Sequence, residues 1–444
     1  MTMIDDETLD EDTAAEHIHG ICLKTGPPRR AGVELEWLVR DARNPAMPVQ
    51  AERIAAAVAD FSAGSDSDAA PGLPVSSAPG ILPSGATLTT EPGGQLEISS
   101  QPADSLTDLV DATMADLAAL RAAAVGAGLE LAGFGLDPLR PPHRVLTLPR
   151  YATMEAFFDR GGPWGRRMMC GTASVQVCLD AGDEADGASG YRRRWELVHA
   201  IGPVLVAAFA NSPLWLGRPT GWRSSRQQVW SHMDPGRTRA PKIGPDPRQA
   251  WARYALDAQV MCLRADGSDD WSAPPGLTFR DWVRGGGAQA RALRRPTVGD
   301  LDYHLSTLFP PVRPHGHLEL RMIDAQPDDG WLVPLAVTTA LLDDARASDA
   351  AMAAAERLWS GQSSDGSGLW RRAAELGPAD PDIASASREC FEAAGAALSR
   401  QAGVAGLRSA VDAFVERYVS RDRCPADDQL ADGPQPAAES EEAR

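Results

Sequence analysis

The chain has 444 residues, of which 43% are hydrophobic and 23% charged, a composition ordinary for a globular protein that can bury a sizeable core. The net charge of −18 gathers at the two ends, where residues 1–16 carry seven acids without a base and residues 425–444 six acids with one arginine, and this argues against nucleic acid as a partner. The longest apolar stretch, 204–209, cannot span a bilayer, and the acidic N-terminus does not resemble a signal peptide, so we expect a cytoplasmic protein without a membrane partner.

The order of elements indicates one catalytic domain between two acidic ends. We expect an acidic tail at 1–20, a single domain at 21–420 whose last third is rich in helix, and an acidic disordered tail at 421–444. Alternation with period two predicts strands, and helical spacing of apolar residues predicts helices. The predicted strands are 32–37, 94–99, 173–180 and 317–324. The predicted helices are 104–125, 192–210, 333–359, 384–402 and 404–419, and residues 62–85 are predicted to form a long surface loop.

Two residue types limit the chemistry. The six cysteines form no C-x-x-C pair, so we expect free thiols. Lys24 and Lys242 are the two lysines of the chain, and there is no G-x-x-x-x-G-K-[ST] phosphate loop. A bound nucleotide would therefore have to be held by arginines and metal ions.

Polar side chains share one face of the four predicted strands, because residues two apart on a strand point the same way. This face carries Glu34 and Glu36 on the first strand, Gln95 and Glu97 on the second, Ser174, Gln176 and Cys178 on the third, and Glu319 and Arg321 on the fourth. If the strands form one sheet, the opposite, apolar face packs on helices.

The carboxylates of this face need cations, because adjacent like charges repel. On this face, Arg321 is the one predicted positive charge near the negative charges of Glu34, Glu36 and Glu97. Oxygen ligands without cysteine favour hard ions, so the pattern predicts Mg²⁺ or Mn²⁺. The segment TTEPGGQLE, 89–97, adds Glu91 and a tight glycine turn, which lets a ligand approach the main chain closely.

A rival metal site reads H-x-H-x-E, with His315, His317 and Glu319 as ligands for zinc or iron. Pro314 and Gly316 interrupt the alternation there, so we expect the strand to begin at His317 and rank this site below the carboxylate face. The motifs G-x-S-x-G, H-E-x-x-H and G-x-G-x-x-G are absent from the chain.

At the same residues the sequence resembles the plant-type glutamate–cysteine ligases, a family that also occurs in bacteria. The matching segments follow in order over most of 30–330. They are GVELE (32–36), TEPGGQLEIS (90–99), GFGLDP (133–138), LPRYATM (148–154), MMCGTASVQVCLD (168–180), FANSPLWLGRPTGWRSSRQQVW (209–230), DPGRT (234–238), YALD (254–257), LTFRDW (277–282) and HLSTLFPPVRPHGHLELRMID (304–324).

The resemblance implies an α+β fold with a glutamine-synthetase-like catalytic domain, in which a curved antiparallel sheet is backed by helices. It implies that ATP activates the γ-carboxylate of L-glutamate as an acyl phosphate, which the amine of L-cysteine then attacks. Two or three Mg²⁺ ions, or Mn²⁺, would assist. By this resemblance the metal ligands are Glu34, Glu36, Glu91, Glu97 and Glu319, the catalytic residue at the transferring phosphate is Arg321, and the substrate- or nucleotide-binding residues are Arg226, Gln95 and Gln176.

The chain departs from the plant pattern at Cys178, where the plant enzymes have asparagine, and in the 62–85 loop. With its composition, these departures resemble the bacterial branch that supplies ergothioneine synthesis, although glutathione supply stays open, as does the oligomeric state. Three alternatives remain: a ligase of the same fold with another amine acceptor, a zinc or iron enzyme using His315 and His317, and a non-catalytic acidic binding module.

Overall fold

The computed structural model describes residues 9–26, 28, 30–61, 79–265, 267–362 and 367–433. Its centre is an antiparallel sheet in the order β2-β3-β4-β1-β6-β10-β9, with β5 paired to the far end of β1. The strands are β1 (Ala31–Asp41), β2 (Gly80–Ile81), β3 (Thr87–Thr90), β4 (Leu96–Ser99), β5 (Leu129–Ala132), β6 (Ser174–Leu179), β9 (Val312–Pro314) and β10 (Leu318–Asp324). A separate small hairpin joins β7 (Leu214–Trp215) to β8 (Arg218–Pro219).

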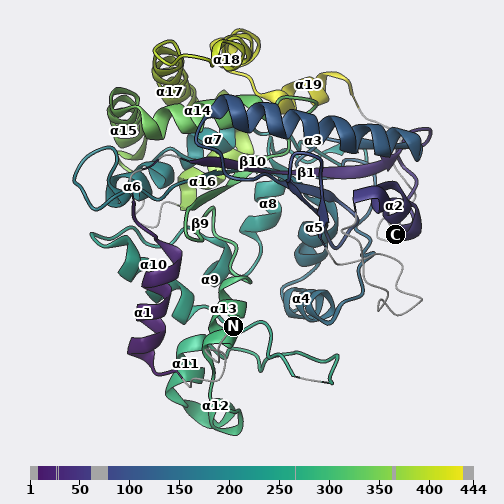
Figure 1. The fold of residues 1–444 in the computed structure, drawn as a ribbon, viewed down its shortest axis with the longest axis vertical. Helices are drawn as coiled ribbons and strands as arrows, with labels where there is room; N and C mark the ends of the chain where they lie inside the picture. Colours follow the sequence, from purple (N-terminus) through teal and green to yellow (C-terminus); the bar gives the residue numbers. More distant parts are fainter. Residues whose placement is uncertain are drawn as a thin grey trace.

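Helices lie on both sides of this sheet (Figure 1). On one side, α3, α7 and α14 contact the strands, and α15, α17 and α18 form a further layer beyond α14. The helices of the first half are α1 (Glu11–Cys22), α2 (Ala51–Val58), α3 (Leu106–Gly126), α4 (Pro149–Asp159), α5 (Trp164–Gly171), α6 (Tyr191–Ala200) and α7 (Gly202–Ala208). They are followed by α8 (Ser225–Ser231), α9 (Pro235–Thr238), α10 (Pro247–Asp257), α11 (Phe279–Arg284), α12 (Gly287–Ala292) and α13 (Val298–Leu305). The last are α14 (Leu332–Asp343), α15 (Ala345–Trp359), α16 (Ser367–Leu376), α17 (Pro381–Leu398), α18 (Ala405–Arg417) and α19 (Pro425–Ala431).

The four predicted strands are confirmed as β1, β4, β6 and β10, and they are neighbours in one sheet. Their apolar side chains, among them Val33, Leu35, Ile98, Val177 and Leu320, are buried in the main core. Strand β10 begins at Leu318, one residue later than predicted. The predicted α+β class, with a sheet backed by helices, is therefore confirmed.

The predicted helices exist, but two of them are interrupted. Ser105 caps α3 by accepting a hydrogen bond from the Asp108 amide at 3.1 Å, as the sequence suggests. The predicted helix 192–210 is two helices, because Pro203 lies in the first turn of a new helix that begins at Gly202, where its missing N–H costs nothing. The predicted helix 333–359 ends at Asp343, and Asp344 caps the next helix through the Ala347 amide at 2.9 Å.

The N-terminal boundary was predicted wrongly. Within the predicted tail 1–20, residues 11–20 belong to α1, which a capping box between Asp10 and Thr13 initiates. Leu9, Ala14 and Ile18 are buried in the main core, and α1 packs on α10. The apolar residues of α1 lie on one face of the helix and hold it against the core, although the segment as a whole is acidic. Residues 1–8 lie outside the described part.

The C-terminal boundary needs the same correction. Helix α19 lies inside the predicted disordered tail 421–444, with Ala426 buried. The Gln429 amide donates to the backbone oxygen of Asn211 at 3.0 Å and to its side-chain oxygen at 2.6 Å. Residues 434–444 are not described. Of the predicted loop 62–85, residues 62–78 are also outside the described part, whereas Gly80–Ile81 forms the edge strand β2.

In the part of the chain that the structure describes, no helix combines the length and the apolar character needed to cross a membrane.

Candidate active site

The sheet register brings the predicted polar residues together on one face. Glu36 lies opposite Glu97 across β1 and β4, and Glu34 lies opposite Gln176 across β1 and β6. Glu319 lies opposite Cys178 across β10 and β6. These pairs come from strands that are far apart in sequence, so the sheet itself assembles the site.

Gln176 is the centre of this face and is only 1% exposed. Its side-chain amide donates to Glu36 Oε1 at 3.1 Å and to Glu97 Oε2 at 3.5 Å, and its oxygen accepts from Arg321 Nη1. The register of β10 shifts between Leu320 and Ile323, so Arg321 and Met322 together occupy the stretch opposite Gln176, as in a β-bulge. The bulge places Arg321 against Gln176, at the middle of the carboxylates.

Glu319 is paired with two guanidinium groups. Arg313 lies opposite it on β9 and binds both carboxylate oxygens, with Nε at 2.6 Å and Nη2 at 2.9 Å, and Arg321 binds it through Nη1. Burial alone would raise the pKa of Glu319, but Arg313 and Arg321 outweigh burial and lower this pKa to about 2. Glu319 is thus held as a carboxylate.

The other carboxylates lack such partners. Burial, reinforced by Glu319, raises the pKa of Glu34 to about 7, and burial together with Glu36 raises the pKa of Glu91 to about 7. Burial and its acidic neighbours also raise the pKa of Glu97, which accepts a hydrogen bond from Thr89 at 3.1 Å. The raised pKa values show that these buried carboxylates are poorly stabilised as anions, and a bound cation would stabilise their charged form.

The donor atoms suit Mg²⁺ or Mn²⁺, because they are carboxylate oxygens on a partly desolvated face. Among the described residues, no group of three or more His, Cys, Asp or Glu side chains is arranged as a ready-made metal cage. The chemistry therefore fits a hard divalent ion, and the ligands would have to turn toward it. The rival site is not supported, because His315 and His317 both lie between the end of β9 at Pro314 and the start of β10 at Leu318, so the alternation that would align them with Glu319 does not extend to them.

Gln95 supports the glycine turn rather than facing the carboxylates. Its oxygen accepts from the Gly93 amide at 3.0 Å, and its nitrogen donates to the backbone oxygens of Met169 at 3.2 Å and Thr172 at 2.9 Å. Both amide hydrogens are thereby used, so this conformation does not favour the predicted substrate-binding role. A Cβ on Gly93 would lie 2.4 Å from the backbone of Cys170, so glycine is required for this close approach.

Arg226, predicted to bind a substrate or the nucleotide, lies beside Arg321. It lies on α8, is 3% exposed, and donates through Nη2 to the backbone oxygen of Arg321 at 2.8 Å. Its Nη1 is 3.8 Å from Asp324, and neither Nη1 nor Nε makes a hydrogen bond. Since buried guanidinium groups are normally hydrogen-bonded, these free donors suit an anionic ligand. Glu36 is close enough to influence the pKa of Arg226.

Sequence reasoning missed two arginines at this site. Arg313 binds Glu319, and Arg150, at the start of α4, is near enough to Glu91 to oppose part of the rise in the pKa of Glu91. Arg150 also lies over the ring of Tyr303 and donates to the backbone oxygen of Ser306 at 3.0 Å. Both arginines lie inside the segments that carry the family resemblance, and this position is the feature of the sequence that could have identified them as site residues.

The solved structure of glutamate–cysteine ligase from Francisella tularensis in complex with AMP has a TM-score of 0.52 and 12% identity, covering 92% of this chain and 85% of that one. This likeness shows the fold alone. Residues 30–443 match the model of Glutamate-cysteine ligase family 2 (GCS2), and the chain belongs to this family.

Named relatives agree with this assignment. The chain is 38% identical to the glutamate–cysteine ligase EgtA of Mycobacterium tuberculosis, over 96% of this chain and 90% of the relative. It is also 38% identical to EgtA of Mycolicibacterium smegmatis, over 96% of both chains. The chloroplastic glutamate–cysteine ligase of Brassica juncea is 32% identical over 54% of this chain and 46% of the relative.

Proposed function

We propose that the chain joins the γ-carboxylate of L-glutamate to the amine of L-cysteine, with ATP converted to ADP and phosphate through γ-glutamyl phosphate. Family membership and two EgtA relatives at 38% identity support the reaction class. The observation that carries the chemistry is the carboxylate face itself, in which Glu34, Glu91 and Glu97 have raised pKa values while Arg321 and Arg226 stand beside them.

Mg²⁺ would be held by Glu34, Glu36, Glu91 and Glu97, with Glu319 at the edge of the set. When bound, it would neutralise the charge that the triphosphate and the incoming carboxylate share. Arg321, fixed by Gln176 and Glu319, would stabilise the transferring phosphoryl group.

Arg226 would bind a carboxylate of glutamate or a phosphate oxygen through its free Nε and Nη1. Arg226 is buried and donates a hydrogen bond to the backbone oxygen of Arg321, so the position of Arg226 depends on the backbone of β10 at the bulge. The sheet and α8 would thereby fix the two substrates relative to each other, and the same burial would exclude water that hydrolyses an acyl phosphate.

The product would supply ergothioneine or another low-molecular-weight thiol, which the EgtA relatives favour. We expect the reaction in the cytoplasm, where ATP is available and thiols stay reduced; the six cysteines are all free in the structure. The second candidate is a ligase of the same fold with another amine acceptor, because the carboxylate face bears on phosphoryl transfer and not on the choice of amine.

Phosphate release tests this function directly. With Mg²⁺, ATP, glutamate and cysteine present, we expect steady release that stops when any one of them is omitted. Release with another amine in place of cysteine, at a higher kcat/KM, would favour the second candidate. No release with any amine would contradict the ligase assignment.

A further inference from the structure

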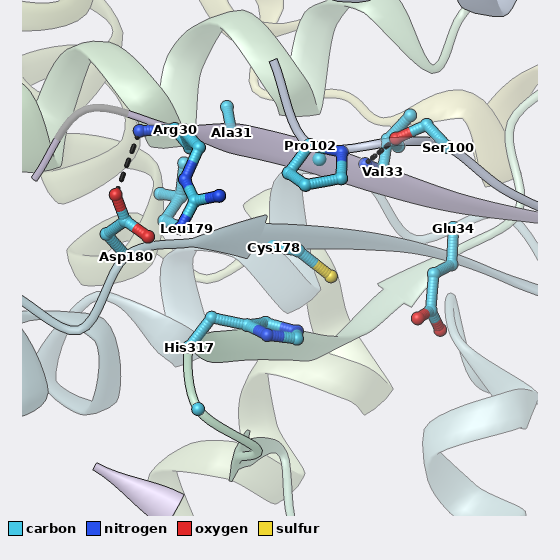
Figure 2. Close-up of a pocket in the computed structure, with 12 residues that line it drawn as sticks. Arg30, Ala31, Val33, Glu34, Ser100, Pro102, Cys178, Leu179, Asp180 and His317 are labelled. Atoms are coloured by element: carbon cyan, nitrogen blue, oxygen red, sulfur yellow. Dashed lines mark hydrogen bonds between the residues drawn. The ribbon is translucent and has the colours of Figure 1, made fainter. Parts of the chain in front are cut away.

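Asp324 is the last residue of β10 and lies at the opposite end of this strand from a cavity of about 200 Å³. The cavity adjoins the start of β10, where His317 and Glu34 line it (Figure 2). Asp324 is 2% exposed, and a Cβ on Gly135 would lie 2.4 Å from its Cγ. The main chain therefore packs directly against this buried carboxylate.

Three donors from the protein occupy the carboxylate oxygens of Asp324. Oδ2 accepts hydrogen bonds from the backbone amide of Asn211 at 2.9 Å and from the Ser212 hydroxyl at 2.7 Å, and Oδ1 accepts from the Ser224 hydroxyl at 2.9 Å. Leaving a buried donor without its acceptor is costly, so these bonds fix the positions of the three donors. Asp324 would therefore act in a reaction through the residues that it holds.

The two serines connect Asp324 to the first turn of α8. The Ser212 hydroxyl accepts a hydrogen bond from the backbone amide of Arg226 at 3.1 Å. Ser224 is the N-cap of α8, and its hydroxyl accepts from the backbone amide of Gln227 at 3.2 Å. Because both hydroxyls accept from amides, their own hydrogens are left to donate to Asp324. Asp324 thus holds, through two serines, the turn that carries Arg226.

The same turn of α8 is hydrogen-bonded to the bulge of β10. Arg226 donates through Nη2 to the backbone oxygen of Arg321 at 2.8 Å. The side chain of Gln227 donates to the backbone oxygen of Met322 at 2.9 Å. Nη1 of Arg226 is 3.8 Å from Oδ1 of Asp324. The turn and the bulge therefore hold each other in place, and Asp324 lies where they meet.

Helix α19 holds Asn211, one of the donors to Asp324. Figure 1 shows α19 on the α14 side of the sheet and α8 on the opposite side. The side-chain amide of Gln429 donates to the backbone oxygen of Asn211 at 3.0 Å and to its side-chain oxygen at 2.6 Å. Asn211 also donates through its side chain to the backbone oxygens of Gly133 and Ala325, each at 2.8 Å. A continuous series of hydrogen bonds therefore leads from α19 through Asp324 to α8.

We propose that Asp324 is a positioning residue for Arg226, which it fixes beside the carboxylates by holding the first turn of α8 against the bulge of β10. The inference rests on the proposed function, in which Arg226 binds a carboxylate of glutamate or a phosphate oxygen. Nε and Nη1 of Arg226 are free for such a ligand, so the packing around them must set their place. A displacement of about 1 Å at such a contact can lower the rate roughly 10²-fold.

Steady-state kinetics of Asp324→Asn test the assignment. The variant keeps the volume but replaces one accepting oxygen by an NH₂ group, so at least one of the three donors loses its acceptor. We expect kcat/KM for glutamate to fall about tenfold or more.

Asp116→Asn is the matched control. Asp116 lies on α3, is 1% exposed, and accepts hydrogen bonds from the backbone amides of Ser84 and Ala86. This variant should also lower the melting temperature, because it too leaves a buried amide without its acceptor, but it should keep kcat/KM within about twofold of wild type. Equal losses of kcat/KM in Asp116→Asn and Asp324→Asn would overturn the assignment.

A double-mutant cycle with Arg226→Lys distinguishes positioning from a general loss of structure. If Asp324 acts through Arg226, Asp324→Asn should lower kcat/KM for glutamate by less than about threefold once Arg226 is lysine, because the guanidinium group that Asp324 positions is absent. Effects of the two substitutions that multiply would overturn the assignment.

Ser212→Ala tests the same point if Asp324→Asn does not fold. It keeps Asp324 and removes the connection from Asp324 to the backbone amide of Arg226. We expect kcat/KM for glutamate to fall about threefold or more, with a nearly unchanged melting temperature. Wild-type kcat/KM in Ser212→Ala would overturn the assignment.

The proposed function and this inference can fail separately. If wild type releases no phosphate with ATP, glutamate and any amine, the ligase assignment fails. Calorimetry of glutamate binding to wild type and to Asp324→Asn needs no turnover and still tests the effect on Arg226, and equal affinities would overturn it. If wild type is an active ligase while Asp324→Asn keeps its kcat/KM, the ligase assignment stands and the positioning role fails.

Discussion

Arg313 and Glu319 face each other across the β9–β10 pair, and the guanidinium group of Arg313 binds both oxygens of Glu319, at 2.6 and 2.9 Å. Glu319 is 1% exposed and is also bound by Arg321. Arg313 thus keeps Glu319 ionised, and the ionised carboxylate in turn binds Arg321 and fixes its position.

Arg313→Met is therefore expected to destabilise the protein, because it leaves a buried carboxylate with one partner instead of two. The loss in free energy of unfolding should be about 3 kcal/mol, as for other broken buried ion pairs. The double variant Arg313→Met/Glu319→Met removes both charges and should be more stable than the single variant. Urea unfolding measures both; a double variant less stable than Arg313→Met would contradict this account.

Glu36→Gln should abolish turnover and leave the fold intact, because it removes a negative charge from the face and keeps the volume. Loss of a direct metal ligand is expected to reduce kcat by roughly 10³-fold or more. Phosphate release measures the rate, and thermal unfolding checks the fold. Activity within about threefold of wild type would refute the assignment of Glu36 to the metal site.

Arg321→Lys should be nearly as damaging as Arg321→Ala. Arg321 binds Gln176 and Glu319 through the same nitrogen, Nη1, so its other guanidinium nitrogens can reach phosphate oxygens, whereas lysine offers a single nitrogen for all of these partners. We expect turnover to fall by roughly 10²-fold or more in both variants, with glutamate binding less affected. Nearly normal activity of the lysine variant alone would make Arg321 a charge neutraliser and Arg226 the next candidate for the phosphate contact.

Helix α1 should be required for stability, in contrast to a dispensable tail. Ile18 is fully buried in the main core, so Ile18→Ala should cost about 2–5 kcal/mol in free energy of unfolding. Removing 1–16 would also remove Leu9, Ala14 and the cap, and should lower the melting temperature strongly. Removing only 1–8, which precedes Leu9, is the control. An unchanged melting temperature after removal of 1–16 would contradict the packing of α1.

His304 should make stability fall as the pH falls. Its Nε2 donates to the backbone oxygen of Ala255 at 2.8 Å, and burial, with Arg237 nearby, lowers its pKa to about 3. The folded ring therefore stays neutral below the ordinary pKa of about 6.5, while the unfolded chain takes up a proton, so stability is lost as the pH falls from about 6.5 toward 3.

The effect of this one group between pH 7 and 5 should be about 2 kcal/mol in free energy of unfolding. His304→Gln keeps a donor for Ala255 and cannot titrate, so its stability should depend less on pH by that amount. The exposed His143→Gln serves as the control. Parallel pH profiles for wild type and His304→Gln would show that the ring is not held neutral.

The sequence by itself determined the polar face. Period-two alternation is local geometry, so Glu34 with Glu36, and Glu319 with Arg321, had to share a side of their strands wherever those strands lay. It also predicted that acidic residues outnumber arginines on this face, and hence that hard cations suit it, although Arg313, which pairs with Glu319, lay outside the pattern. The helices were predictable for the same reason, as far as their apolar spacing continued.

The tertiary structure decided everything that depends on partners distant in sequence. Whether Gln95 faces a ligand or the backbone depends on Met169 and Thr172, and no local pattern contains that choice. The bulge that sets Arg321 against Gln176 is a mismatch between two strands, so it exists only once they pair. Helix α1, at 11–22, forms for the same reason, since the burial of Ile18 against the core outweighs the polar composition of this segment.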